Sequence, residues 1–254
     1  MIETTADGGR HWTVRLHTNG PLTAVTLVPG GRLVATVNRR GLLLSSDQGR
    51  TWRQLTHERV YNPSFATPTQ GWALGPSSGV AVTADGGRTW RKLPDPCRWV
   101  PMAQSVSAVS PAVAYVACVG EPGAGQQPKM ILRTDNGGVS WTTVDAAPMT
   151  SDPTPAPARS HGLLTGGYLS GMAILPDLRG WLWGGRSDLS RTDDAQHWGT
   201  IATKVVQPDV TTVVSADFMS DANGFALLWK NGGTSLIRTT DGGARWTSVH
   251  RWPG

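Results

Sequence analysis

One eight-residue pattern recurs six times along the chain and constrains its fold more than any other feature. Its general form is Ser/Thr-x-Asp-x-Gly-x-x-Trp, and we call each copy a box. The six boxes span residues 5–12, 45–52, 83–90, 134–141, 191–198 and 239–246. The fourth box has Asn136 in place of the aspartate, and the fifth has Arg191 in place of Ser/Thr and Ala195 in place of glycine. A unit that recurs in this way indicates a repeated supersecondary structure.

The residue types of the box suit a tight hairpin loop. The hydroxyl and the carboxylate can accept hydrogen bonds from backbone N–H groups of a turn. The glycine suits a backbone with positive φ, and the tryptophan can bury its ring while its indole N–H meets a carbonyl. We therefore assign the boxes a structural role. Their Asp or Asn and Trp residues are Asp7 and Trp12, Asp47 and Trp52, Asp85 and Trp90, Asn136 and Trp141, Asp193 and Trp198, and Asp241 and Trp246.

Short apolar segments surround each box and read as strands. Before the second box they are residues 22–28, 32–38 and 42–46, and residues 51–55 follow as a fourth strand. The chain contains 31 Gly and 18 Pro, which disfavour helix interiors. Successive box tryptophans are 38 to 57 residues apart. Four antiparallel strands at this period predict an all-β chain folded as a β-propeller, with a box between the third and fourth strands of each blade.

The ends and one internal segment depart from the repeat. Residues 1–16 supply only the last two strands of a blade, so we expect about six blades with an incomplete N-terminal blade, in a single domain over residues 1–254. The alternative is part of a seven-bladed propeller. Residues 145–167 are rich in Pro, Ala, Ser and Thr. This composition predicts an extended, mobile excursion between blades.

The charge and the cysteines bear on partners and compartment. The formal net charge is +5, carried mostly by arginines that occur singly. Nucleic-acid binders cluster their basic residues, so we expect no nucleic-acid partner, whereas an acidic protein or glycan partner is compatible with this charge. No apolar run reaches the length of a membrane span. Cys97 and Cys118 are either one disulfide, which implies an oxidising compartment, or two free thiols.

Catalytic and metal-binding patterns are weak in this sequence. A two-carboxylate hydrolase needs a pair of acids across a cleft, and none of the acids outside the boxes has a recognisable catalytic context. The acids on loops are Glu58, Asp95, Glu121, Asp152, Asp188 and Asp209. The six histidines lack paired ligand spacing, and one carboxylate per box is too few for calcium. We therefore predict no catalytic residues, no metal and no cofactor.

Arginine and aromatic residues on the loops opposite the boxes are the candidate binding residues, because these residue types anchor protein interfaces. Arg39 and Arg40 form the tip of a short turn and are the sharpest candidates. The full set is Arg39, Arg40, His57, Glu58, Arg59, Tyr61, Arg98, Trp99, Arg186 and Trp229.

The boxes resemble the Asp-box, or BNR, repeats of sialidases, some endo-glucanases, sortilin-type receptors and the photosystem II stability/assembly factor family. The sequence Gly-Trp-Ala-Leu-Gly at 71–75, followed by Thr-Ala-Asp-Gly-Gly-Arg-Thr-Trp at 83–90, is most similar to the assembly-factor branch. The resemblance implies the propeller fold, but enzymes, receptors and assembly factors share the motif, so it does not decide the function. We expect a non-catalytic, monomeric scaffold outside the cytoplasm that binds a protein or glycan; no export signal is present in this sequence. The alternative is a glycan-active hydrolase, sialidase-like or endo-glucanase-like. The Arg-Ile-Pro signature of sialidases is missing near the N-terminus.

Overall fold

The computed structural model describes residues 1–76, 79–98, 100–148, 161–186, 189–201 and 211–252. Over these ranges every named element is a β-strand. No described segment forms a helix with the length and apolarity that crossing a membrane requires. Candidate residue Trp99 and most of the excursion, residues 149–160, lie outside the described residues.

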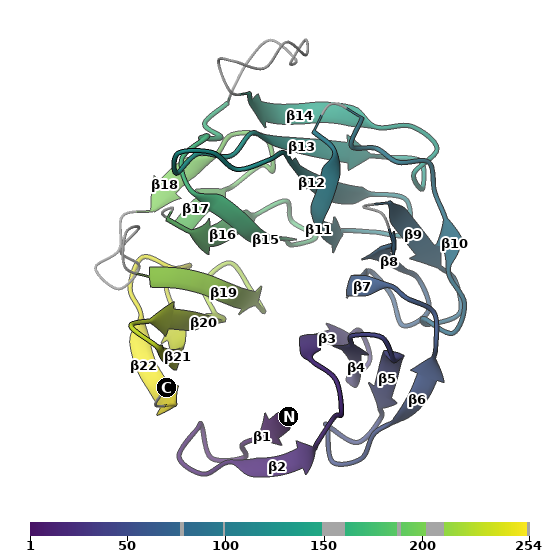
Figure 1. Ribbon diagram of the computed structural model, residues 1–254, viewed down its shortest axis with the longest axis vertical. Coiled ribbons are helices and arrows are strands. Elements are labelled where there is room, and N and C mark those ends of the chain that lie inside the picture. The colour runs from purple at the N-terminus through teal and green to yellow at the C-terminus, as the bar shows by residue number, and fades with distance from the viewer. Residues whose placement is uncertain (77–78, 99, 149–160, 187–188, 202–210, 253–254) are drawn as a thin grey trace. The chain divides into compact units, whose positions relative to one another are not determined.

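The strands form antiparallel sheets in chain order (Figure 1). The N-terminal hairpin pairs β1 (Ile2–Thr4) with β2 (Thr13–Leu16). The first full sheet comprises β3 (Leu22–Val28), β4 (Arg32–Val37), β5 (Gly41–Ser45) and β6 (Arg53–Thr56). The next comprises β7 (Tyr61–Phe65), β8 (Gly71–Leu74), β9 (Val80–Thr83) and β10 (Arg91–Lys92), and the third comprises β11 (Met102–Ala108), β12 (Ala114–Val119), β13 (Lys129–Thr134) and β14 (Thr142–Ala147).

The remaining eight strands form one continuous sheet that consists of two sets of four. The first set is β15 (Tyr168–Ile174), β16 (Gly180–Gly185), β17 (Leu189–Thr192) and β18 (Gly199–Ile201). The second set is β19 (Thr211–Phe218), β20 (Gly224–Lys230), β21 (Gly233–Thr239) and β22 (Thr247–Trp252). A single residue pair, Gly185 with Thr212, joins the sets through β16 and β19. The prediction of four-stranded antiparallel units with an incomplete first unit is confirmed.

The chain divides into two compact units. The first contains Met1–Pro96, Val106–Tyr115 and Thr134–Trp141, and the second contains the remaining residues. The core of each unit lies between neighbouring sheets. In the first unit, Val34 and Leu44 of one sheet pack with Phe65 and Ala73 of the next. In the second unit, Trp181 of β16 stacks on Phe218 of β19, with ring centroids 3.8 Å apart.

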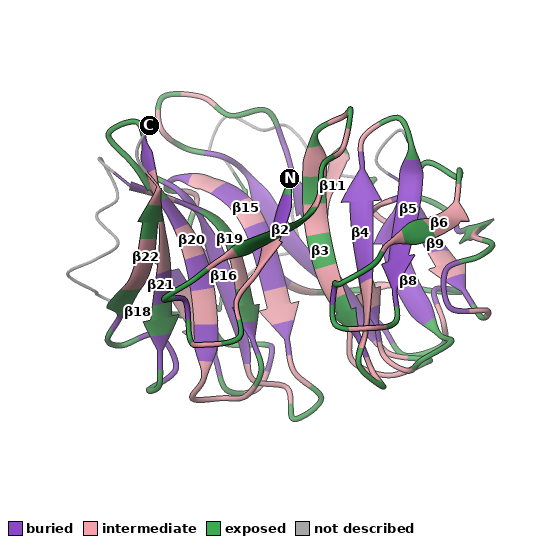
Figure 2. Cartoon of the chain, turned by 90° about the horizontal axis from the view of Figure 1, so that it is seen from below, coloured by how far each residue is buried: buried purple, intermediate pink, exposed green. Residues whose placement is uncertain are grey.

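Burial within a sheet follows the position of the strand (Figure 2). In the first full sheet, β5 is buried along its whole length, whereas β3 alternates between buried or half-buried and exposed residues. The side chains of Val25 and Leu27 on β3 are 45% and 55% exposed. The sequence of the central strand β5 is therefore a continuous apolar run, whereas residues on the edge strand β3 alternate in burial.

The glycine that opens β8 gives space to an aromatic ring. A Cβ at Gly71 would lie 2.5 Å from the ring of Phe65, the last residue of β7. Gly224 at the start of β20 makes the same approach to Phe218, also at 2.5 Å. A side chain at either position would displace a ring that belongs to the core, which explains why both strands begin with glycine.

The intact boxes share one hydrogen-bonding pattern. In the third box, the Thr83 hydroxyl accepts the Gly87 N–H at 2.9 Å and donates to Asp85 at 2.8 Å. One Asp85 oxygen accepts the N–H groups of Arg88 and Thr89. The Trp90 indole N–H then donates to the Gly87 carbonyl at 3.1 Å. Gly87 adopts φ of +89°, a backbone region that favours glycine.

The fifth box is one residue shorter than the pattern, and this corrects its assignment. Asp194, not Asp193, accepts the N–H groups of Gln196 and His197, each at 2.8 Å, and accepts the hydroxyl proton of Thr192. Asp193 instead forms a surface ion pair with Arg191. The sequence alignment of Arg191 with Ser/Thr placed the box one residue too early, because it kept the full spacing to the tryptophan.

The excursion is also shorter than the sequence indicates. Residues 145–147 belong to β14 and pair with β13. Residues 161–167 are held by hydrogen bonds to that sheet and to the loop before it, as described below. Residues 145–147 are therefore part of a strand and not of the irregular excursion, whereas residues 161–167 contain no strand.

The corrected fifth box predicts that replacing two adjacent aspartates, Asp193 and Asp194, lowers the free energy of unfolding by different amounts. Asp194→Ala removes the acceptor of two backbone N–H groups and should lower the free energy of unfolding by about 1–3 kcal/mol. Asp193→Ala removes only a surface ion pair and should change it by less than about 1 kcal/mol. Chemical denaturation of both variants measures the difference. An equal effect, or a larger effect of Asp193→Ala, would contradict the correction.

The box carboxylates also predict acid sensitivity. Hydrogen bonds from the side chain and then the backbone of Thr51 lower the pKa of Asp47 to about 2. The unfolded chain takes up this proton near its ordinary pKa of about 4, so the stabilisation is present above pH 4 and is lost as pH falls through about 2. In Asp47→Asn, the fall in thermal midpoint between pH 5 and pH 2 should be smaller than in the wild type.

The fourth box supplies the reciprocal variant. Asn136 already accepts the Ser140 N–H at 3.0 Å without carrying a charge. Asn136→Asp should therefore add acid sensitivity to the thermal midpoint over the same pH range. Parallel pH profiles for the wild type and both variants would show that the box carboxylates do not determine the acid response.

Candidate binding sites

A group of unpaired basic side chains lies at one end of the sheet β3–β6. Arg39 and Arg40 occupy the turn between β4 and β5, and both are exposed. Arg39 has φ of +63°. A Cβ at Gly41 would touch the backbone of Thr56 and His57, so this turn lies directly beside the end of β6. His57 and Arg59 follow in the chain and are also exposed. None of the four basic side chains, those of Arg39, Arg40, His57 and Arg59, forms an ion pair among the described residues.

Two further candidates in the same segment have structural contacts. The Glu58 carboxylate accepts the backbone N–H of Trp90 at 3.2 Å and so links the end of β6 to the third box. Tyr61 begins β7 and is half-buried. We define the basic cluster as Arg39, Arg40, His57 and Arg59, because Glu58 and Tyr61 serve packing and sheet connection.

The candidates of the second unit do not gather in the same way. Arg98 is exposed and follows Cys97, which forms a disulfide with Cys118 of β12. Trp229 lies on β20 and is 48% exposed. Arg186 follows β16 and has φ of +54°. Among the described residues no hydrogen bond or ion pair connects these three side chains.

Segment 161–167 is held at one end by a buried carboxylate. The Asp145 side chain on β14 is 1% exposed. One of its oxygens accepts the His161 N–H at 2.7 Å, and the other accepts the Leu163 N–H at 3.0 Å. A buried carboxylate that accepts several backbone N–H groups stabilises the loop that donates them.

A buried ammonium group holds the other end of the same segment. Lys129, at the start of β13, is 5% exposed. Its Nζ lies 2.9–3.3 Å from five backbone carbonyl oxygens, those of Gln127, Leu164, Thr165, Gly166 and Gly167. Burial lowers the pKa of Lys129 to about 8, while the carbonyl oxygens favour the charged form, so the group is protonated at neutral pH.

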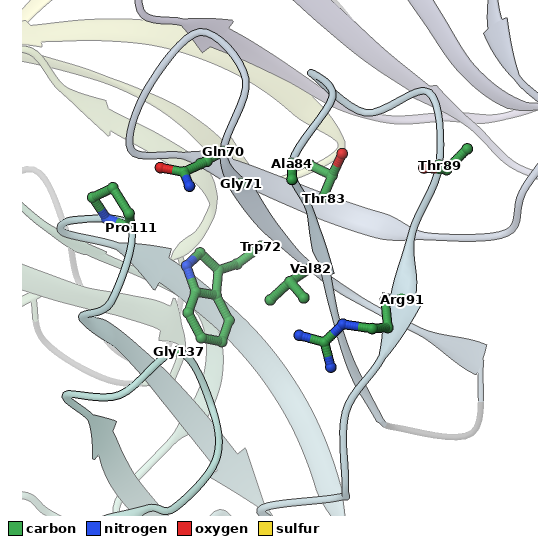
Figure 3. Close-up of a pocket in the computed structure, with 10 residues that line it drawn as sticks. All are labelled: Gln70, Gly71, Trp72, Val82, Thr83, Ala84, Thr89, Arg91, Pro111 and Gly137. Carbon is green, nitrogen blue, oxygen red and sulfur yellow. The ribbon is translucent and has the colours of Figure 1, made fainter.

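One cavity of about 310 Å³ opens beside the third box in the first unit (Figure 3). The Trp72 ring, the Val82 side chain and the Arg91 guanidinium extend toward a shared space. Gln70 and Thr89 add polar groups, although the Thr89 hydroxyl is already bonded to Asp85. The lining contains no carboxylate among the described residues, so it offers an aromatic and cationic surface without an acid.

We call Lys129 and the five carbonyl oxygens around its Nζ the Lys129 cage. A second cavity of about 160 Å³ lies beside it in the second unit. Lys129 and Arg186 contribute positive charge, and Ser190 and Thr200 contribute hydroxyls. The apolar part of the wall consists of Leu163, Leu164, Leu169, Leu182 and Trp183. Of the sequence-predicted binding residues that the structure describes, only Arg186 lines either of these two cavities.

Sequence reasoning missed Lys129 and Asp145 because their partners are backbone atoms about 16 to 38 residues further along the chain. Backbone N–H and C=O groups are nearly the same in every residue type, so the sequence does not show where such partners lie. Gly-Trp at 71–72 entered the sequence analysis only through the family resemblance, and its place in a cavity depends on two loops of the next sheet, which contribute Pro111 and Gly137. No cluster of three or more His, Cys, Asp or Glu side chains within the described residues is arranged to hold a metal ion.

These sheets, with a box between the third and fourth strands of each, define a β-propeller fold. The chain is similar to the structure titled "YCF48 bound to D1 peptide", with a TM-score of 0.51 and 18% identity over 93% of this chain and 83% of that chain. It is also similar to YCF48 from Cyanidioschyzon merolae, with a TM-score of 0.56 and 18% identity over 92% of this chain and 86% of that chain.

A GH74 xyloglucanase from Xanthomonas campestris has a TM-score of 0.46 and 13% identity over 89% of this chain and 43% of that chain. No protein-family model matches the chain, and a search of curated proteins finds no match. At these identities the likeness shows the fold alone.

The Lys129 cage predicts a strong response to loss of one charge. Lys129→Met keeps most of the aliphatic volume but removes the ammonium donor that the five carbonyl oxygens share, and of the five the Thr165 carbonyl still accepts the Gln127 N–H. The free energy of unfolding should fall by about 1–3 kcal/mol, and hydrogen exchange of residues 161–167 should accelerate. Lys92→Met on exposed β10 is the control and should change stability by less than about 0.5 kcal/mol. Unchanged exchange in Lys129→Met would contradict the cage.

Proposed function

We propose that this protein is a non-catalytic binding or assembly scaffold whose basic cluster docks an acidic segment of a partner protein. The observation that carries the proposal is the set of four exposed, unpaired basic groups at one end of β3–β6. Arginine presents several N–H donors in a planar fork that matches a carboxylate. The three arginines against one carboxylate, that of Glu58, leave an excess of positive charge, which steers partners of the opposite sign to the surface.

A protein partner has support from the fold comparison. The similar YCF48 structure is titled as bound to D1 peptide, so a propeller of this type can bind a polypeptide. We extend polypeptide binding to this chain as part of the proposal, together with membership of the Asp-box propellers closest to the photosystem II stability/assembly factor family. A glycan partner is the second possibility, and the protein acts as a monomer in both.

Glycan hydrolysis is the alternative function, and it has less support. Such a reaction requires two carboxylic groups across a cleft. Both cavities described above have walls of apolar, hydroxyl and cationic residues, with no acid among the described lining residues. Binding needs only the exposed cluster, which is present.

We place the protein outside the cytoplasm. The support is the bond between Cys97 and Cys118, since structural disulfides persist in oxidising compartments. The sequence-based expectation of an acidic partner is consistent with the formal charge of +5.

A charge-reversal experiment tests the role of the basic cluster. The probe is a fluorescently labelled peptide rich in glutamate, measured by anisotropy at physiological salt. Arg39→Glu combined with Arg40→Glu should weaken binding about tenfold or more, because the docking charges are inverted. Arg50→Glu combined with Arg53→Glu is the matched control, because both are exposed residues of the second box and β6.

The two double variants share the same net charge. Each Arg→Glu substitution removes two units, so both change the formal charge from +5 to +1. A control that binds within about threefold of the wild type supports a specific cluster. Equal loss in both double variants would show that only overall charge matters and would overturn the docking site.

A further inference from the structure

The cavity of about 310 Å³ beside the third box, which we call the third-box cavity, contains an unused hydrogen-bond donor on an almost completely buried side chain. Trp72 is 2% exposed and lines this cavity. Its indole N–H has no hydrogen-bond partner among the described residues. Other unpartnered indole nitrogens, those of Trp141, Trp183 and Trp198, are sealed inside the protein, whereas that of Trp72 is not. An unpartnered donor on a buried side chain calls for an explanation.

A second tryptophan at the same strand position shows that the fold can satisfy this donor. Trp181 is the second residue of β16, as Trp72 is of β8. The Trp181 indole N–H donates to the carbonyl of Gly242 in the sixth box at 2.8 Å. Trp72 instead meets the fourth box with its benzene ring, since a Cβ at Gly138 would lie 3.2 Å from Cζ3 of Trp72. The edge that carries the N–H is therefore turned away from the box.

The open donor lies beside a free amide. Figure 3 shows the Trp72 nitrogen on the edge of the ring that faces Gln70 and Pro111. The Gln70 side-chain amide has no hydrogen bond among the described residues, and it can both donate and accept. The Trp72 ring is fixed by an edge-to-face contact with Trp141, with ring centroids 5.9 Å apart. A fixed N–H donor beside a free amide is complementary to a peptide group, which has one acceptor and one donor.

Another part of the wall carries a cation without a counter-ion. Across Val82 from Trp72, the Arg91 guanidinium extends toward the cavity (Figure 3). Arg91 forms no hydrogen bond or ion pair among the described residues. The Asp85 carboxylate of the third box is already bonded to the hydroxyl and the backbone N–H of Thr89. The planar donors of Arg91 are therefore available to a carboxylate from outside the protein.

The volume and the remaining wall define what joins these two polar ends. A cavity of about 150 Å³ holds one benzene ring, so about 310 Å³ accommodates roughly two groups of side-chain size. Val82, Ala84 and Pro111 provide apolar surface for aliphatic carbon atoms. A glutamate within a peptide has this combination, because it carries a main-chain carbonyl and N–H, two methylene groups and a carboxylate.

We propose that the third-box cavity binds an acidic residue of an extended polypeptide, with a main-chain carbonyl at the Trp72 indole N–H and the carboxylate at Arg91. The site rests on the proposed function only in that its occupant is a protein. It is formed at the box ends of β8 and β9, whereas the basic cluster surrounds the turn between β4 and β5, at the end of β5 away from its box. Short peptides therefore test the cavity apart from the basic cluster.

The test follows the indole N–H resonances of ¹⁵N-tryptophan-labelled protein during titration with the peptide acetyl-Ala-Glu-Ala-N-methylamide. Trp72→Phe identifies the resonance of interest. The glutamate peptide should shift this resonance saturably. The peptide with glutamine in place of glutamate has the same shape without the charge and should bind about tenfold more weakly. Equal affinity for the two peptides, or no saturable shift with the glutamate peptide, would overturn the proposal.

Two neighbouring cations of β10 give a matched pair of variants. Arg91→Gln should weaken binding of the glutamate peptide about tenfold and abolish the preference for glutamate over glutamine. Lys92→Gln also removes one positive charge from an exposed residue of β10, but Lys92 does not line the cavity. It should bind the glutamate peptide within about twofold of the wild type. Unchanged affinity in Arg91→Gln, or an equal loss in both variants, would contradict the site.

The double variant Arg39→Glu, Arg40→Glu separates the cavity from the basic cluster. At physiological salt it should bind the glutamate tripeptide within about threefold of the wild type, because exposed charges more than about 8 Å apart are largely screened. A loss of tenfold or more would assign the tripeptide to the basic cluster and overturn the cavity site. Unchanged binding of the longer glutamate-rich peptide by this variant would instead count against the basic cluster alone.

Discussion

In five of the six boxes, the hydrogen bond from the box glycine N–H to the Ser/Thr hydroxyl is the local contact on which the hairpin between the third and fourth strands depends. It closes the turn between the third and fourth strands, and it orients the hydroxyl so that it donates to the aspartate. The aspartate carboxylate then accepts the N–H of the residue before the tryptophan, and the tryptophan indole N–H donates to the glycine carbonyl. Every partner lies within one short loop, so a blade can form its outer hairpin before any contact with its neighbour.

The neighbouring sheets then use the same loops as packing surfaces. The Trp181 indole N–H donates to the Gly242 carbonyl of the sixth box at 2.8 Å, and Trp72 packs against Gly138 of the fourth box. A box therefore has an internal role in its own sheet and an external role for the sheet before it. The two roles fall on different residues of one loop. Asn136 can replace the aspartate because its amide oxygen accepts the same N–H, and the glycine position needs a positive φ, which Ala195 adopts in the shortened fifth box.

Local patterns in the sequence predicted the fold well, because box, strand and turn signals all act over a few residues. The same reasoning misplaced the fifth box, where Ala195 has φ of +56° and takes the position of glycine in a shortened loop. It found the exposed turn of Arg39 and Arg40, since turn residues are exposed in almost any sheet. It could not find the cavities, because Lys129, Trp183 and Arg186 become neighbours only when segments far apart in the chain pack together.

Lys129 and Asp145 together place both signs of charge inside the second unit without pairing them to each other. The carboxylate binds N–H groups at one end of segment 161–167, and the ammonium binds carbonyl oxygens at the other. Many proteins gather backbone carbonyls of this kind around a metal ion taken from solution. Here the cation is part of the chain, so no chelator can extract it and no shortage of calcium or potassium can release the loop. The ammonium that holds this segment is covalently part of the chain, so its retention does not depend on the metal ions outside the protein.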